Sequence, residues 1–182
     1  MSSSRKKSGA LGHSAGFSLI ELLIVVAIIL IIAAIAIPNL LRSRIAADEA
    51  SATNSVRSIN TAEFAYNAQY PTNGYATGLI NLGGVAPCVP TPAAACLIDN
   101  VLANAIVGSA GKSGYVFAAT GLVPNGATFL SFVSAASPSD YNRSGVRDFC
   151  STEDGVIRFD AGAPASLPVN TLAACRAFSI ME

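Results

Sequence analysis

Hydrophobic and polar positions follow three patterns along the chain. Residues 17–37 are almost entirely apolar, and Glu21 is their only charged side chain. Residues 39–70 repeat apolar side chains at helical spacing, and beyond residue 114 short β-rich runs alternate with turns. This order predicts an α+β protein in which a long N-terminal helix, apolar all round at first and one-sided later, packs on an antiparallel sheet.

The apolar run of residues 17–37 is long enough to cross a bilayer. A helix rises about 1.5 Å per residue, so the run reaches roughly 30 Å, the thickness of the hydrocarbon core. Arg5, Lys6 and Lys7 precede the run. By the positive-inside rule these basic residues keep the N-terminus cytoplasmic, so we expect a single-span helix with the rest of the chain on the outer side.

Glu21 is not explained by a plain anchor. A carboxylate among aliphatic neighbours costs a few kcal/mol or more in mid-membrane and marks a functional position by default. If the chain is cut between Gly16 and Phe17, the new α-amine lies one helical turn from Glu21. With an ordinary pKa of about 7.7–8.0, this amine is largely protonated. Glu21 can then pair with its own amine or with that of an adjacent copy, and the second pairing makes the acid an assembly device.

The stretch from Gly16 to Pro38 resembles the N-terminal signature of type IV pilins and of the related type II secretion pseudopilins. The resemblance rests on Gly16 before Phe17, the acid Glu21, the apolar run and Pro38. It implies that a prepilin peptidase of the inner membrane cuts after Gly16 and methylates the amine of Phe17. It also implies that Glu21 neutralises a neighbouring subunit's N-terminus during assembly.

The same resemblance implies a structural role. The precursor would be a single-pass inner-membrane protein with a cytoplasmic N-terminus, and its partners would be the peptidase, an inner-membrane assembly platform and further copies of itself. Those copies would form a helical homopolymer, the extracellular type IV pilus. The alternative is a pseudopilin of a type II secretion system, which forms a short periplasmic filament.

A secretory signal peptide and a plain anchor are the competing interpretations of the same stretch. Ala34-Ile-Ala36 offers a small-x-small cleavage site after an apolar segment. Glu21 within that segment, the segment's length and its distance from the basic triplet argue against a signal peptide. N-terminal sequencing separates the three possibilities, because the mature chain then begins at Phe17, Ile37 or Met1.

We divide the chain into five segments. They are the cleaved leader (1–16), the transmembrane and filament-core half of the helix (17–37), its amphipathic half (38–70), a variable loop with a short helix over about 98–105 (71–114), and the sheet with the C-terminal tail (115–182). Pro38 is expected to kink the helix rather than end it, because proline removes one backbone hydrogen bond.

The amphipathic half carries one apolar stripe. Its members recur at intervals of three, four or seven residues: Ile45, Ala52, Val56, Ile59, Tyr66 and Tyr70. Most charges of this segment are expected to lie off the stripe: Arg42, Arg44, Asp48, Glu49, Arg57 and Glu63. The stripe should pack against the chain's own sheet.

Four antiparallel strands are predicted in the last segment. The β-rich runs are residues 115–120, 128–134, 147–151 and 156–159. Turn residues separate each pair, Pro124-Asn-Gly126 in the first and Glu153-Asp154-Gly155 in the second. The fold is therefore a pilin-like helix on a four-stranded sheet, with an irregular tail from Ala161 that folds back over it.

All four cysteines follow the membrane span. An even number of cysteines in an oxidising compartment predicts disulfides, and four cysteines allow three pairings. We favour Cys88–Cys96, which closes a proline-rich loop, and Cys150–Cys175, which joins the tail to a strand. The second bridge also resembles the C-terminal disulfide loop of type IV pilins. The alternative, a zinc site, needs closer cysteine pairs than these.

The residue inventory argues against an enzyme and against a nucleic-acid-binding protein. The chain has eleven basic and eleven acidic side chains, and loss of the leader leaves eight basic ones. That balance gives no basic surface for nucleic acid. His13, the only histidine, lies in the leader, so the mature chain can form no Ser-His-Asp, Cys-His or HExxH site. We predict no catalytic residue and no cofactor.

One loop offers a weak calcium pattern. Oxygen-bearing side chains occur at alternate positions, Asp140, Asn142 and Ser144, and Gly145 follows them. Asp148 falls at the ninth position of a calcium loop, but the twelfth is Ser151 rather than glutamate, and Arg143 would repel a cation. Turn chemistry explains the same residues more simply, so we predict no metal here.

Overall fold

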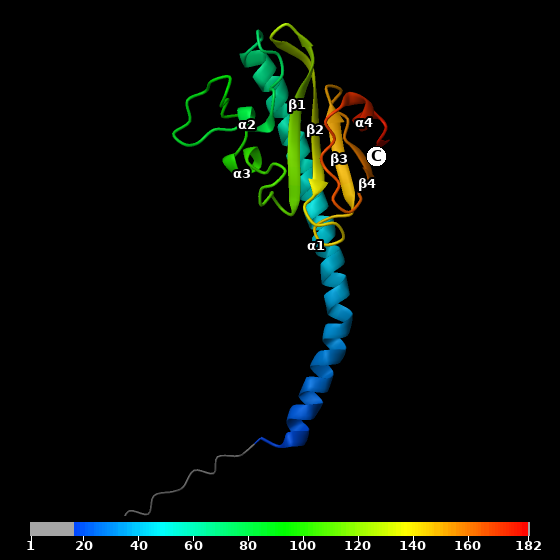
Figure 1. Cartoon of the computed structure of the whole chain (residues 1–182). Coiled ribbons are helices and arrows are strands. Elements are labelled where there is room, and N and C mark those ends of the chain that lie inside the picture. Colours follow the sequence, from blue (N-terminus) through cyan, green and yellow to red (C-terminus); the bar gives the residue numbers. More distant parts are fainter. Residues whose placement is uncertain (1–16, 182) are drawn as a thin grey trace, which may run out of the picture. The chain divides into compact units, whose positions relative to one another are not determined.

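The computed structural model describes residues 17–181 (Figure 1). Its helices are α1 (Leu19–Gln69), α2 (Leu79–Leu82), α3 (Asn100–Ala103) and α4 (Leu172–Arg176). Its strands are β1 (Tyr115–Asn125), β2 (Thr128–Pro138), β3 (Arg147–Thr152), β4 (Arg158–Ala161) and β5 (Ser179–Ile180). The chain divides into two compact units, Met1–Asn39 and Leu40–Glu182, and we call the second the head.

The head contains one antiparallel sheet in the order β1-β2-β3-β4-β5. β1 and β2 form a long hairpin whose register runs from Tyr115 opposite Pro138 to Asn125 opposite Thr128. Gly126 in the turn has φ +65°, a left-handed conformation that glycine adopts without steric cost. The predicted α+β fold, a long helix packed on an antiparallel sheet, is confirmed.

The predicted number of strands is wrong, because the sheet has five strands rather than four. Ser179 and Ile180 form β5 and pair with Phe159 and Arg158 of β4. The tail is also less irregular than expected, since α4 begins after Thr171, whose hydroxyl accepts a hydrogen bond from the Ala174 N–H. A strand of two residues forms through tertiary pairing, so its own sequence carries no detectable β pattern.

Most of the apolar stripe of α1 lies in the core of the head, although Ile45 is only partly buried. Ala52, Val56 and Ile59 are fully buried, and they pack in one cluster with Phe117 of β1 and Phe149 of β3. Burying a side chain of this size contributes about 1.5–3 kcal/mol. The expectation that most charges lie off the stripe fails at two glutamates, which are among the most buried residues of the helix.

Glu49 is 4% exposed and connects α1 to the start of β3. Its Oε1 accepts a hydrogen bond from the Val146 N–H at 3.0 Å. Its Oε2 accepts a hydrogen bond from Nε of Arg147 at 2.9 Å and forms an ion pair with Nη2 of the same arginine at 2.7 Å. A buried carboxylate is tolerated when its oxygens are paired in this way. Glu49 therefore fixes the helix against the sheet at one end of their contact.

Glu63 is fully buried and has a different environment. Its Oε2 accepts the Ala76 N–H at 2.8 Å, while its Oε1 has no hydrogen-bond partner within residues 17–181. Burial raises the pKa of Glu63 from 4.5 to about 8, although the Ala76 hydrogen bond lowers it in part. The side chain is thus mostly neutral at pH 7 and connects α1 to the loop that follows it.

Asn60 connects α1 to β2 and β3, two neighbouring strands of the sheet. Its Nδ2 donates to Oγ of Ser151 at 2.8 Å, and its Oδ1 accepts the hydroxyl of Ser134. All three residues are buried. Because buried polar groups are costly when unpaired, this set also defines one alignment of the helix on the sheet.

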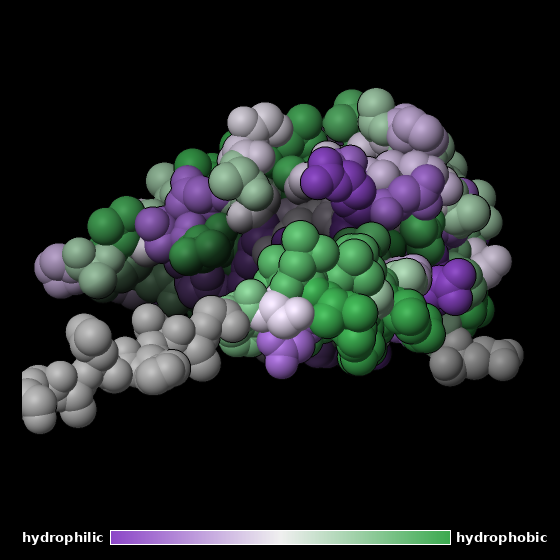
Figure 2. Space-filling view, turned by 90° about the horizontal axis from the view of Figure 1, so that it is seen from below, coloured by the Kyte–Doolittle hydropathy of each residue, from purple (hydrophilic) through white to green (hydrophobic). Residues whose placement is uncertain are grey.

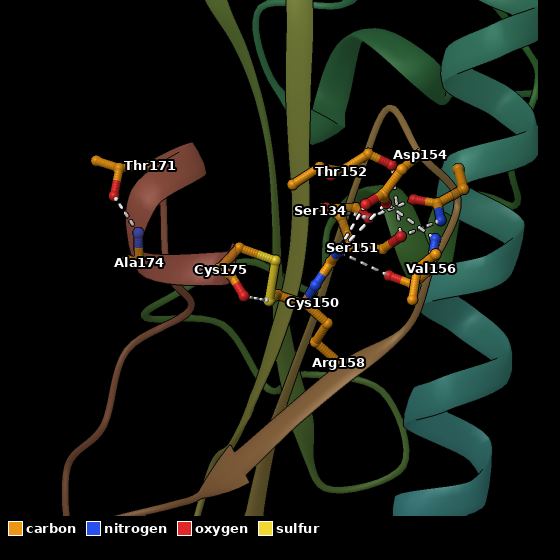
Figure 3. The surroundings of a disulfide bond; sticks show 11 residues. Ser134, Cys150, Ser151, Thr152, Asp154, Val156, Arg158, Thr171, Ala174 and Cys175 are labelled. Atoms are coloured by element: carbon orange, nitrogen blue, oxygen red, sulfur yellow. Dashed lines mark hydrogen bonds and ion pairs between the residues drawn. A yellow bond between two sulfur atoms is a disulfide. The ribbon is translucent and has the colours of Figure 1, made fainter. Parts of the chain in front are cut away.

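The structure joins Cys88 to Cys96 and Cys150 to Cys175, the pairing that the sequence favoured. The first bridge closes the loop between α2 and α3, and the second joins β3 to α4 (Figure 3). The predicted helix over 98–105 is shorter than expected, Asn100–Ala103. Asp99 begins it by accepting the Leu102 N–H.

Removing the second bridge should destabilise the head more than removing the first. The two cysteines of Cys150–Cys175 are 25 residues apart and those of Cys88–Cys96 are 8 apart. In the loop-entropy model the longer loop contributes about 3 kcal/mol, roughly 1 kcal/mol more than the shorter one. Denaturant unfolding of the two double-alanine variants measures the difference. Equal losses would show that strain or unfolded-state structure outweighs loop length.

Candidate assembly site

The helix begins beside Glu21. The backbone N–H of Ser18, the residue before α1, donates to Oε2 of Glu21 at 2.9 Å. Because α1 begins at Leu19, Glu21 is the third helical residue. Ser18 and Glu21 therefore have the Ser-x-x-Glu spacing of a capping box. A negative charge is also favourable at a helix N-terminus. This capping role was not predicted, although the Ser-x-x-Glu spacing alone indicates it.

The first part of α1 has no buried side chain. From Phe17 to Leu41, large apolar side chains are between 46% exposed at Val26 and 81% exposed at Phe17. They surround the helix rather than forming a stripe, and Figure 2 shows a contiguous group of hydrophobic residues on the face seen from below. Each of these side chains would gain about 1.5–3 kcal/mol on leaving water. This surface therefore requires a bilayer or other apolar chains around it.

By length and composition this part of α1 can cross a membrane, and it is the one such helix in residues 17–181. The helix continues through Pro38, in agreement with the prediction that this proline does not end it. Glu21 and Pro38 are both on α1 but are not brought together, since they are about 25 Å apart along the helix axis. Phe17 lies just before the helix, and Gly16, with the rest of the leader, lies outside the described residues.

The two aspartates of the calcium pattern have partners other than a metal ion within the described residues. Asp140 forms an ion pair with Arg143 at 3.2 Å, and Asp148 accepts a hydrogen bond from Ser166 of the tail. Across residues 17–181, no group of three histidine, cysteine, aspartate or glutamate side chains could hold a metal ion. The loop instead has the hydrogen bonds of a turn, from the N–H groups of Arg143 and Ser144 to the Asp140 carbonyl.

Residues 11–37 match a family model, the prokaryotic N-terminal methylation motif. This motif is typical of type IV pilins and type II pseudopilins, proteins that are typically structural rather than enzymatic. No curated protein and no solved structure matches the chain. The chain thus carries a prepilin-type N-terminal motif, and it has an α+β pilin-like fold.

The motif also bears on processing and location. A prepilin motif implies processing by the prepilin peptidase, and the apolar helix that begins within it indicates a membrane precursor. The motif includes Gly16, Phe17 and Glu21, and it ends one residue before Pro38. The residues predicted to act in processing and assembly therefore all belong to the first unit, whereas both disulfides belong to the head.

Proposed function

We propose that this chain is the structural subunit of a type IV pilus. It is made as a single-span precursor, cut after Gly16, methylated at Phe17 and polymerised through α1. The observation that carries the proposal is the methylation motif at residues 11–37, which includes the start of a helix whose apolar side chains are exposed all round in this range. The same surface serves first as a membrane span and then as the filament core.

Assembly follows from the change of surroundings. Within a bilayer, apolar helices gain little by leaving lipid, so close packing and polar pairing must favour their association. A protonated amine at Phe17 of one copy and the carboxylate of Glu21 in the next supply that pairing. Outside the membrane, the same apolar side chains must stay covered, which favours the filament over free subunits.

The five segments acquire separate roles under this proposal. Residues 1–16 are removed, residues 17–37 form the core, and residues 38–70 support the head through their apolar stripe. The variable loop and the sheet cover the filament. The assembly platform and the peptidase act in the inner membrane, before the subunit enters the extracellular filament.

The cut site can be tested directly. Gly16→Val should leave a full-length precursor in the membrane, because a peptidase that grips this residue closely leaves no room for a Cβ. Gly9→Val, an equal change elsewhere in the leader, should be processed normally. Mass spectrometry of the wild-type chain should show a methylated Phe17 at its start. A start at Ile37 would contradict the proposal and favour a secretory signal.

The second candidate is a type II secretion pseudopilin, because the matched motif is typical of both classes. Electron microscopy of cells with and without the gene separates the two. Long surface filaments that depend on the gene support the pilus. Their absence, together with loss of a secreted protein, supports the pseudopilin.

A further inference from the structure

A pocket of about 470 Å³ opens in the head between α1 and the loop that joins β2 to β3. Leu41 and Arg44 line it from the helix, and Asp140, Arg143 and Ser144 line it from the loop. It thus combines an apolar side chain with charges of both signs. Nothing in the fold or in the assembly proposal uses this pocket.

The loop that carries Asp140 and Arg143 is held in place by its own hydrogen bonds. The Ser144 hydroxyl donates to the Asp140 carbonyl at 3.0 Å and accepts the Asp140 N–H at 3.1 Å. Gly114 permits this closure, since a Cβ at that position would lie 2.5 Å from the Ser144 Cβ. The charged side chains of the pocket are therefore presented by a fixed backbone.

The two guanidinium groups keep donors for another anion. Arg44 is 74% exposed and its Nε lies 3.7 Å from Asp48, while Arg143 is 83% exposed and lies 3.2 Å from Asp140. Ion pairs this exposed contribute only about 0–1 kcal/mol, so neither one sequesters its arginine. Asp140 is about half exposed and likewise keeps an oxygen for a cation.

The position of the pocket along α1 indicates what reaches it. Leu40 and Leu41 are exposed and continue the apolar run, and Arg42 and Arg44 follow at once. If residues 17–37 span the hydrocarbon core, Arg44 lies about 10 Å further along the helix. That distance corresponds to the headgroup layer, where interfacial arginines are found and phospholipid phosphates are dense.

We propose that this pocket binds the headgroup of a zwitterionic phospholipid with a primary ammonium group, of the phosphatidylethanolamine class, while the precursor is in the membrane. Arg44 and Arg143 hold the phosphate, Asp140 accepts from the ammonium, and Leu41 contacts the glycerol end of the lipid. The inference rests on the membrane precursor of the proposed function. The two signs of charge in the pocket match a zwitterion better than an anion.

The full chain in nanodiscs tests the proposal. The discs contain phosphatidylcholine and phosphatidylethanolamine in equal parts. The protein is released from the discs in the mass spectrometer, and the lipid molecules that stay bound to it are counted. Phosphatidylethanolamine should be retained in excess, because the quaternary amine of phosphatidylcholine has no N–H to donate. Arg44→Gln and Arg143→Gln should each lower this retention about fivefold, the equivalent of about 1 kcal/mol per interfacial arginine.

Two further variants sharpen the result. Arg57→Gln removes an exposed arginine from the same helix outside the pocket and should change nothing. Asp140→Asn should keep a lipid bound but abolish the preference for phosphatidylethanolamine. A further variant combines Arg44→Gln with Arg143→Gln. If it retains as much phosphatidylethanolamine as the wild type, the proposal is overturned.

Two other outcomes would also overturn it. These are stronger retention of phosphatidylglycerol than of phosphatidylethanolamine in discs where phosphatidylglycerol replaces phosphatidylcholine, and displacement of the lipid by millimolar inorganic phosphate. Failure of the membrane precursor on which this inference rests gives a different result, because a chain that does not span a membrane would not enter the discs at all. Lipid retention is read without any cleavage or polymerisation, so those steps can succeed while this inference fails.

Discussion

Glu21→Val should abolish filament assembly while the chain is still inserted in the membrane and cut after Gly16. The variant leaves the amine of a neighbouring Phe17 buried without its partner. Breaking a buried ion pair by removing one member costs about 3–5 kcal/mol, enough to prevent addition of a subunit. The measurement is the yield of sheared filaments relative to membrane-bound processed subunit.

Glu21→Gln separates the two roles that this side chain can have. In the single chain, Glu21 accepts the Ser18 N–H and stabilises the start of α1. Glutamine can make the same capping contact but carries no charge. If ion pairing drives assembly, Glu21→Gln should fail as Glu21→Val does. Normal filaments from the glutamine variant would reduce Glu21 to a helix cap.

Glu63→Gln should make the head more stable at pH 8 and remove much of the pH dependence of its stability between pH 4.5 and 8. Burial raises the pKa of Glu63 in the folded chain from 4.5 to about 8, so within this range the folded state binds a proton that the unfolded state has released. Stability therefore falls by up to about 1.4 kcal/mol per pH unit as the pH rises, and levels off above the folded pKa. Glutamine resembles the protonated form and does not titrate.

Denaturant unfolding of the full chain in detergent, followed at several pH values, measures this slope. Glu63→Ala serves as a control, since it also removes the titration but leaves a cavity and an unpaired Ala76 N–H. The alanine variant should lose stability at low pH, where the glutamine variant should match the wild type. An unchanged slope in Glu63→Gln would show that another group titrates in this range.

The two buried glutamates show where sequence reasoning failed. Glu49 lies four residues after Ile45, and Glu63 lies four after Ile59, so both occupy positions of the apolar stripe. Their charge led to the expectation that they face solvent. Their actual environments depend on distant residues, Arg147 for Glu49 and the Ala76 N–H for Glu63, which no local pattern reveals.

Features set by local chemistry were predictable. The long helix, its stripe and the β1–β2 turn at Gly126 follow from periodicity and turn residues. The existence of β5 and of α4 was not, because β5 depends on pairing of the tail with β4, and α4 lies where the Cys150–Cys175 bridge joins the tail to β3. The Ser18–Glu21 cap is a third case, in which the signal was local but was not used.

The strand order β1-β2-β3-β4-β5 has a consequence for export of the chain. Every strand neighbours the strand that precedes it in the sequence, so no strand must wait for a partner made later. Sheets of this kind close short loops first and are favoured kinetically over sheets that pair distant segments. If the chain crosses the membrane after α1, as proposed, the head can therefore grow one strand at a time as it emerges. Cys175 emerges near the end, so its bond to Cys150 locks the sheet only after β4 has been added.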